Sequence, residues 1–162
     1  MLPIRRLKSI LTEPGGDLSL NRATVDDSDF AFDMKIVAFR PYVEQSLDWN
    51  EVLQRQQHRH NFARHDYRVI TVDGTARGIM SLAVERGCVK VNQLFLAPEH
   101  QGDGIGARCM ALIISEAESL GLRVLLRVMK VNPRAKAFYE RLGFTVISEI
   151  ETHFTMERAL TL

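Results

Sequence analysis

A glycine-rich turn at residues 101–106 separates two stretches of opposite hydrophobic periodicity. Residues 89–96 alternate as a strand does, whereas the apolar residues of 105–120 recur at helical spacing. The first turn of a helix leaves backbone N–H groups unpaired at the positive end of the helix dipole. Glycines without Cβ atoms let an anion approach those groups. The turn therefore predicts a site for a phosphate-bearing cofactor.

The residues around this turn discriminate between nucleotide-binding motifs. A P-loop would end in Gly-Lys-Ser/Thr, but this chain has Gly106-Ala107-Arg108. Gly102, Gly104 and Ala107 fit the dinucleotide fingerprint, which also requires a βαβ unit and an acidic residue about 20 positions on. Neither requirement is met, although a nicotinamide-dinucleotide enzyme stays an alternative to be tested.

The rest of the chain predicts one α/β domain. Residues 1–16 form an N-terminal extension whose Ile4, Leu7, Ile10 and Leu11 fit one face of a short helix, and residues 17–162 form the domain. Pro41 is expected to interrupt the first domain helix. Strands are predicted at 18–22, 67–72, 76–84, 89–96, 124–128, 144–150 and 152–156, and helices from 26, at about 48–61, from 104 and from 133.

Composition and charge exclude several classes of partner. The 162 residues carry a net charge of +1, which gives no electrostatic basis for binding nucleic acid or an anionic membrane. No apolar run approaches the about 20 residues of a membrane-spanning helix. Cys88 and Cys109 lie in apolar segments and are expected to be buried, reduced thiols, which favours a cytoplasmic location. His58, His60 and His65 lack a metal-site spacing, so no metal is expected.

Two motifs resemble those of the GNAT superfamily of acetyl-CoA-dependent N-acetyltransferases. Residues 101–106 resemble its Gln/Arg-x-x-Gly-x-Gly/Ala motif, and residues 131–144 resemble its Asn-x-x-Ala-x-x-x-Tyr-x-x-x-Gly-Phe block. Both occur in the family's order and spacing, and the resemblance extends over about residues 18–157. It implies a mixed, mostly antiparallel sheet of six to seven strands flanked by four helices.

The resemblance also implies an activity, transfer of an acetyl group from acetyl-CoA to a primary amine of a small molecule or peptide. Leu94 and Leu96 would pair with the pantetheine arm through their main chains. Tyr139 would be the general acid that protonates the departing CoA thiolate. The cofactor-binding residues implied are Leu94, Phe95, Leu96, Gln101, Gly102, Asp103, Gly104, Ile105, Gly106, Asn132, Ala135 and Tyr139. Asp103 departs from the basic or neutral residue of many relatives, and its side chain is expected to point to solvent.

The acceptor side has fewer signals. In the superfamily two regions flank the acceptor entrance, and here they contain Tyr42, Glu44, Trp49 and His153. Glu44 and His153 are candidate catalytic groups, and Trp49 beside a carboxylate is suited to hold a substrate ammonium. The acceptor, the base, the acyl length and a homodimer stay open. So does the alternative of a non-catalytic acyl-CoA-binding or sensor domain.

Overall fold

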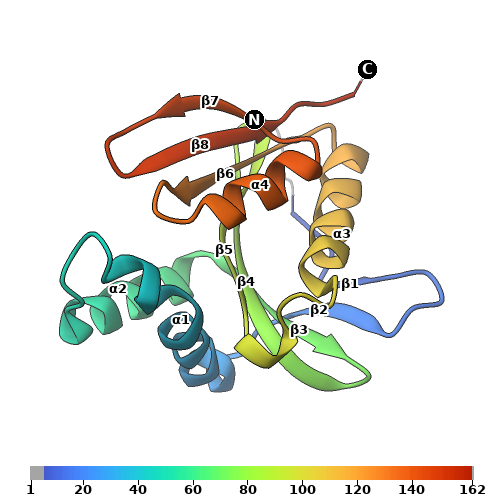
Figure 1. The fold of residues 1–162 in the computed structure, drawn as a ribbon. Helices are drawn as coiled ribbons and strands as arrows, with labels where there is room; N and C mark the ends of the chain where they lie inside the picture. Colours follow the sequence, from blue (N-terminus) through green and yellow to red (C-terminus); the bar gives the residue numbers. More distant parts are fainter. Residues whose placement is uncertain (1–5, 162) are drawn as a thin grey trace.

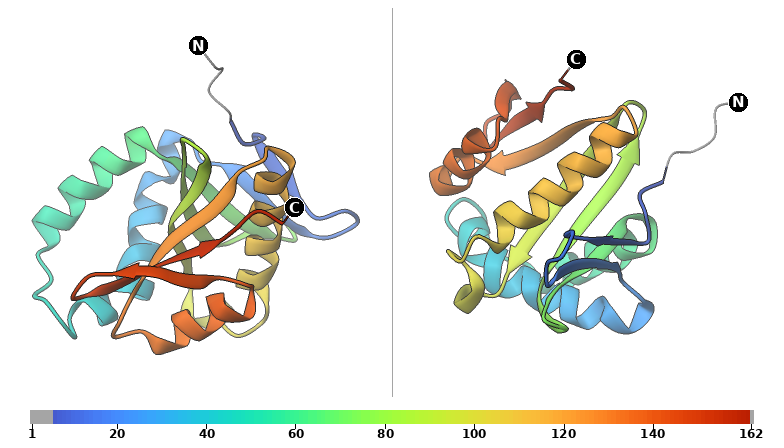
Figure 2. Two further views of the ribbon diagram at one scale, coloured as in Figure 1. Left: turned by 90° about the horizontal axis from the view of Figure 1, so that it is seen from above. Right: turned by 90° about the vertical axis from the view of Figure 1, so that its right-hand side faces the viewer.

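The computed structural model describes residues 6–161, which form one mixed sheet with helices on both faces (Figures 1 and 2). The strands are β1 (Ile10–Thr12), β2 (Leu18–Arg22), β3 (Asp66–Val72), β4 (Thr75–Glu85), β5 (Cys88–Leu96), β6 (Arg123–Met129), β7 (Thr145–Glu149) and β8 (His153–Arg158). The α-helices are α1 (Ser28–Val43), α2 (Glu51–Arg64), α3 (Ile105–Ser119) and α4 (Pro133–Arg141), and short 3₁₀ turns occur at Val25–Asp27 and Pro98–His100.

The sheet is antiparallel except at one place. Its strand order is β1-β2-β3-β4-β5-β6-β8-β7, and only β5 and β6 pair in parallel. Strands β2 to β5 are neighbours in the sheet in the order in which they occur in the chain. The connection from β2 to β3 contains α1 and α2, and the other two connections contain no helix. The α/β class and the flanking helices predicted above are confirmed, with eight strands among the described residues in place of six to seven.

The additional strand corrects the helix predicted for the N-terminal segment. Ile10–Thr12 pairs with β2, so Leu7 and Leu11 are buried in a sheet-edge segment while Ile10 is exposed. An interval of four residues places two side chains on one face of either a helix or a strand, and this explains why the pattern misled. The buried Arg68 fixes the segment by donating to the carbonyl of Ser9. Ile4 lies outside the described residues, and the domain boundary after residue 16 stays a prediction.

Pro41 does not interrupt α1, contrary to expectation. The helix continues to Val43, and the amide of Glu44 still donates to the carbonyl of Arg40. A proline removes its own N–H donor and crowds the carbonyl four residues before it, and near the C-terminal end of a helix few later turns depend on either. The continuation sets where the connection between α1 and α2 begins.

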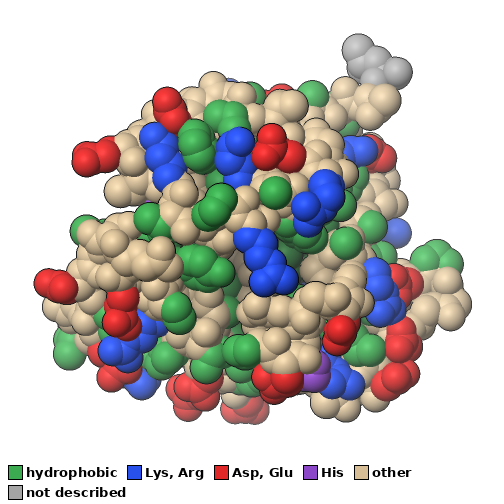
Figure 3. Space-filling view, in the orientation of Figure 1, with side chains coloured by type: hydrophobic (Ala, Val, Ile, Leu, Met, Phe, Trp, Pro, Cys, Tyr) green, Lys and Arg blue, Asp and Glu red, His purple; other side chains and the backbone are tan. Residues whose placement is uncertain are grey.

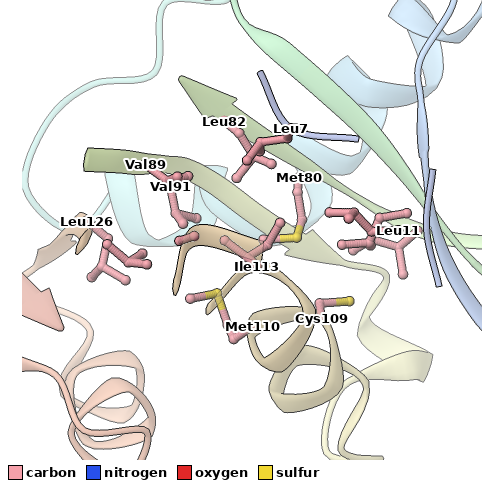
Figure 4. Close-up of a cluster of buried hydrophobic side chains, with 14 of the residues drawn as sticks. Leu7, Leu11, Met80, Leu82, Val89, Val91, Cys109, Met110, Ile113 and Leu126 are labelled. Carbon is pink, nitrogen blue, oxygen red and sulfur yellow. The ribbon is translucent and has the colours of Figure 1, made fainter. Parts of the chain in front are cut away.

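Two groups of apolar side chains hold the layers together. The larger lies between the sheet and α3, where Met110 and Ile113 pack on strand residues such as Met80 (Figure 4). The smaller lies under α1 and α2, around Tyr67 and Ile79. Because side chains alternate along each strand, one face of the sheet supports α3 and α4 and the other supports α1 and α2.

The buried state predicted for both thiols is confirmed. Cys88 and Cys109 are buried and unbridged, and burial raises the pKa of Cys109 to about 12. None of the helices within residues 6–161 is long and apolar enough to cross a membrane. Over the same residues, His, Cys, Asp and Glu side chains form no group suited to a metal ion.

Candidate active site

The central cleft begins where two neighbouring strands separate. β5 and β6 pair only from Cys88 to Val91 on one side and from Arg123 to Leu126 on the other. Asn92 is an extra residue in β5, without a partner on β4, and so forms a bulge at the same point. A bulge bends its strand and commonly lies next to an active site. The bend leaves the edge of β5 after Val91 free to pair with an extended ligand.

The cleft has a volume of about 480 Å³ and passes between the helices on the two faces. Leu94 and Leu96 line it with Gln101 and Gly106 on one side. Phe95 lines it toward α1, where it stacks on Phe39 with ring centroids 5.4 Å apart. Figure 3 shows Lys and Arg side chains across the middle of the face seen in Figure 1, beside a hollowed and largely hydrophobic region.

The glycine-rich turn presents free backbone donors at the start of α3. Within residues 6–161, the amides of Gly102, Asp103 and Gly104 donate no hydrogen bond. The amides of the first helical turn follow them and have no carbonyl partner inside the helix. Gly102 and Gly104 have φ values of 85° and 79°, which favour glycine, and a Cβ at either would meet nothing within 4 Å. The turn is open to an anion.

The cation nearest to this turn is already paired. Arg108 in the first turns of α3 forms ion pairs of 2.6 Å with both Glu13 and Asp17. These carboxylates lie on the connection between β1 and β2, which is therefore tied to the start of α3. Asp103 in the turn is exposed, as the sequence analysis expected.

Two residues of the second motif lie on the same wall of the cleft. Asn132 caps α4 by accepting from the amide of Ala135 at 3.1 Å, which leaves the amide NH₂ of its side chain free. Tyr139 lines the cleft two turns after Asn132 in α4, beside the ring of Phe138. Its hydroxyl forms no hydrogen bond with any described residue, and burial raises its pKa above the ordinary value of 10. The phenol therefore stays protonated at neutral pH.

The acceptor-side residues divide into two groups. Tyr42 and His153 line the cleft. Glu44 and Trp49 lie outside its lining, and both contact Arg40. The carboxylate of Glu44 forms an ion pair with Arg40, and the guanidinium carbon of Arg40 lies 5.6 Å from the centroid of the Trp49 ring. Arg40 thus lies over the Trp49 ring, and the binding of a substrate ammonium by Trp49 stays a prediction.

The surroundings of His153 favour its neutral form. Burial and then the positive charge of Arg127 lower its pKa below the ordinary 6.5. Its Nδ1 lies 2.7 Å from the Thr152 hydroxyl. When that nitrogen carries the proton and donates it to the hydroxyl, the lone pair of Nε2 is available to accept a proton.

Ten of the residues named from the sequence line the cleft, and the others do not. Those in the lining are Tyr42, Leu94, Phe95, Leu96, Gln101, Gly106, Asn132, Ala135, Tyr139 and His153. Gly102, Asp103 and Gly104 form the adjacent turn, and the side chain of Ile105 is buried in the core, which leaves only its amide for a ligand.

Sequence reasoning missed four basic residues in the lining, Lys90, Arg127, Arg134 and Arg141. Arg127 interrupts the apolar run of β6, and this interruption was the available signal. Arg134 and Arg141 are seven residues apart on α4, so they share a helix face. Lys90 is in β5, and nothing in the local sequence showed that β5, β6 and α4 border one cleft.

Comparisons with known proteins agree with this geometry. The sequence profile described as "Acetyltransferase (GNAT) family" matches residues 31–144. The chain is 34% identical over 85 residues to the uncharacterized N-acetyltransferase Rv2669 of Mycobacterium tuberculosis, covering 52% of this chain and 51% of that one. It is 31% identical over 98 residues to the uncharacterized N-acetyltransferase YobR of Bacillus subtilis, covering 60% of this chain and 36% of that one. The chain thus spans about half, or less, of the length of these relatives.

Solved structures share the fold at low sequence identity. PaiA N-acetyltransferase from Thermoplasma acidophilum, solved with coenzyme A, has a TM-score of 0.72 at 16% identity, over 88% of this chain and 98% of that chain. Naa50 of Arabidopsis thaliana, solved with the bisubstrate analogue CoA-Ac-MVNAL, has a TM-score of 0.66 at 16% identity, over 89% and 99%. At such identities the likeness concerns the fold.

Proposed function

Because the chain belongs to the GNAT family of acetyltransferases, we propose that it transfers an acetyl group from acetyl-CoA to a primary amine of a small molecule or peptide. One observation carries this proposal. The separation of β5 from β6 opens a cleft that has free phosphate-binding amides at one end and a protonated phenol within it. A strand edge, an anion site and an acid are the three features that a CoA thioester needs.

The described residues offer groups suited to the pantetheine arm and to the phosphates of the cofactor. The free edge of β5 at Leu94 and Leu96 offers main-chain groups to the amides of the pantetheine arm. The open turn at residues 102–107 offers N–H donors to the pyrophosphate. Arg134 and Arg141 border the same cleft without an ion pair among the described residues, and guanidinium groups suit phosphate oxygens.

In the proposed reaction the amine nitrogen attacks the thioester carbonyl, a C–N bond forms and the C–S bond breaks. Tyr139 donates its proton to the departing sulfur. Burial raises the pKa of this phenol, and the same low-dielectric surroundings would raise the pKa of the thiolate. The phenol thus keeps its proton until the sulfur departs, and a thiolate with a raised conjugate-acid pKa is a better acceptor of that proton.

The attacking amine must lose a proton, and His153 is the proposed acceptor, directly or through water. Since burial lowers its pKa below 6.5, its neutral form predominates at pH 7. We expect kcat/KM, expressed per concentration of unprotonated amine, to fall as the pH drops through that lowered pKa, because protonation removes the lone pair of the imidazole. His153→Gln should lower kcat/KM by about 100-fold and abolish this acidic limb. A pH–rate profile that keeps the limb in the variant would assign the base elsewhere.

Ligand-dependent thermal unfolding tests the cofactor assignment. Acetyl-CoA at 100 times its Kd should stabilise the protein by about 2.7 kcal/mol, whereas NAD(P) should have no effect. The double variant Arg134→Gln/Arg141→Gln should bind acetyl-CoA roughly 10-fold or more weakly. Its affinity for acetyl-pantetheine, which lacks the nucleotide phosphates, should be unchanged. Equal losses for both ligands would show that the arginines do not contact phosphate.

Release of CoA thiol across a panel of amines then tests the reaction itself. Turnover with any primary amine supports the transferase. Binding of acetyl-CoA without turnover of any amine would instead support the non-catalytic sensor domain.

A further inference from the structure

All charged side chains that line the cleft are basic. Among residues 6–161 they are Lys90, Arg127, Arg134 and Arg141, and no Asp or Glu of this part of the chain lines the cleft. None of the four forms an ion pair with another described residue. A concave site lined by charge of one sign focuses its field and attracts ligands of the opposite sign.

These cations lie on two opposite faces of the sheet. Val89 and Val91 belong to the core under α3, so Lys90, between them in β5, projects to the other face. Leu126 and Val128 flank Arg127 in β6 in the same way. Lys90 and Arg127 therefore lie on the face that carries α1 and α2, away from the phosphate-binding turn. Arg134 and Arg141 lie on α4, on the cofactor side.

Glu85 of β4, a diagonal neighbour of Lys90 across the β4–β5 hairpin, and the other described carboxylates nearby form no ion pair with Lys90 or Arg127. Glu157 on β8 is paired with Arg123, and Glu149 on β7 is paired with Lys130 at 3.0 Å. His153, which also borders the cleft, is kept neutral, since burial and Arg127 lower its pKa. The negative charge that would balance Lys90 and Arg127 is therefore expected from the acceptor.

Resting on the proposed transferase function, we propose that the acceptor is a small primary amine that carries a carboxylate, in other words an amino acid, and that Lys90 and Arg127 bind its carboxylate. The guanidinium of Arg127 can hold a carboxylate through two parallel N–H donors, and the Lys90 ammonium adds a second charge. The amine then lies toward His153, which is beside Arg127. Polyamines and aminoglycosides, whose remaining charges are positive, are repelled by the same two side chains.

Matched acceptors that differ by one charge test this proposal. The twenty free L-amino acids are compared with their α-amides, with putrescine and spermidine as cationic acceptors, by CoA release at saturating acetyl-CoA. Rates are expressed per concentration of unprotonated amine, because amidation changes the pKa of the amine. The preferred amino acid should react with a kcat/KM at least about 10-fold above that of its amide.

Variants then locate the effect. Arg127→Gln and Lys90→Gln should each raise KM for the preferred amino acid about 10-fold, with little change in kcat or in KM for the amide. Arg127→Lys, which keeps the charge, should recover a large part of the loss. Arg59→Gln on the exposed face of α2 removes the same charge away from the cleft and should change neither constant.

The outcomes separate the two proposals. Amides or polyamines that react as well as amino acids, or an Arg127→Gln variant with an unchanged KM, would overturn the acceptor assignment while leaving the transferase intact. If acetyl-CoA neither binds nor is consumed with any amine, the proposed function fails and the acceptor assignment fails with it.

Discussion

Replacement of Tyr139 by phenylalanine is expected to lower kcat for acetyl transfer by roughly 100- to 10,000-fold. The variant loses only the phenolic proton donor, so the CoA thiolate must leave without general acid assistance. Because the hydroxyl contacts no described residue through a hydrogen bond, the free energy of unfolding should change by less than about 1 kcal/mol. Steady-state thiol release measures the first effect, and thermal unfolding measures the second.

The chain offers a matched control for this substitution. Tyr67 has a buried hydroxyl without a hydrogen-bond partner and lies under α1 and α2, outside the cleft lining. Tyr67→Phe removes the same atom and is expected to keep wild-type turnover, with equal or slightly higher stability. Full turnover in Tyr139→Phe would remove Tyr139 from the reaction, and the geometry of the cleft would then need another donor.

Gly78→Ala is expected to destabilise the protein by about 3 kcal/mol or more, since the added methyl group cannot be accommodated. A Cβ on Gly78 would lie 2.1 Å from the carbonyl oxygen of Phe95, which is main chain and cannot move aside alone. The corresponding fall in Tm is roughly 6 to 12 °C for a domain of this size. Phe95 lies between the two residues offered to the pantetheine arm, so the affinity for acetyl-CoA should fall as well.

Gly106→Ala serves as the comparison, because its Cβ would lie 3.4 Å from the nearest atom of the Phe138 ring. This distance is within ordinary contact, and alanine favours a helix over glycine by about 1 kcal/mol. The variant should unfold at or slightly above the wild-type temperature, as measured by the same thermal scans. A Gly78→Ala protein with wild-type Tm and affinity would show that β4 and β5 do not approach so closely.

Local sequence patterns were sufficient for most elements. The strands near 18–22 and 67–96, and the helices that begin after Gly104 and Asn132, lie where alternation, glycine turns and caps predicted them. The errors came from signals that are ambiguous locally. Leu7 and Leu11 fit a strand and a helix equally, and the unpaired edge of β2 decided between them.

The candidate site was predictable only where one short segment contains the chemistry. The turn at residues 101–106 and the cap and phenol of α4 each lie within a single motif, so the sequence named them. Glu44 was named because it is a carboxylate in a suitable region, but Arg40, four residues before it on the same helix, pairs with it. Lys90 and Arg127 were missed because they are 37 positions apart, and only the pairing of β5 with β6 brings them to the lining of one cleft.

The sequence by itself indicated the family, through its resemblance to two motifs. It also predicted most of the order of elements and a turn suited to phosphate, because hydrophobic period, glycine conformation and helix capping act over a few residues. Only the tertiary structure decided where the cleft opens, since this depends on a bulge at Asn92 and on the end of pairing between two strands that are far apart in the chain. It also decided the charge of the cleft. Whether a basic side chain is neutralised depends on which carboxylates folding pairs with it, and neither Lys90 nor Arg127 forms an ion pair with a described carboxylate.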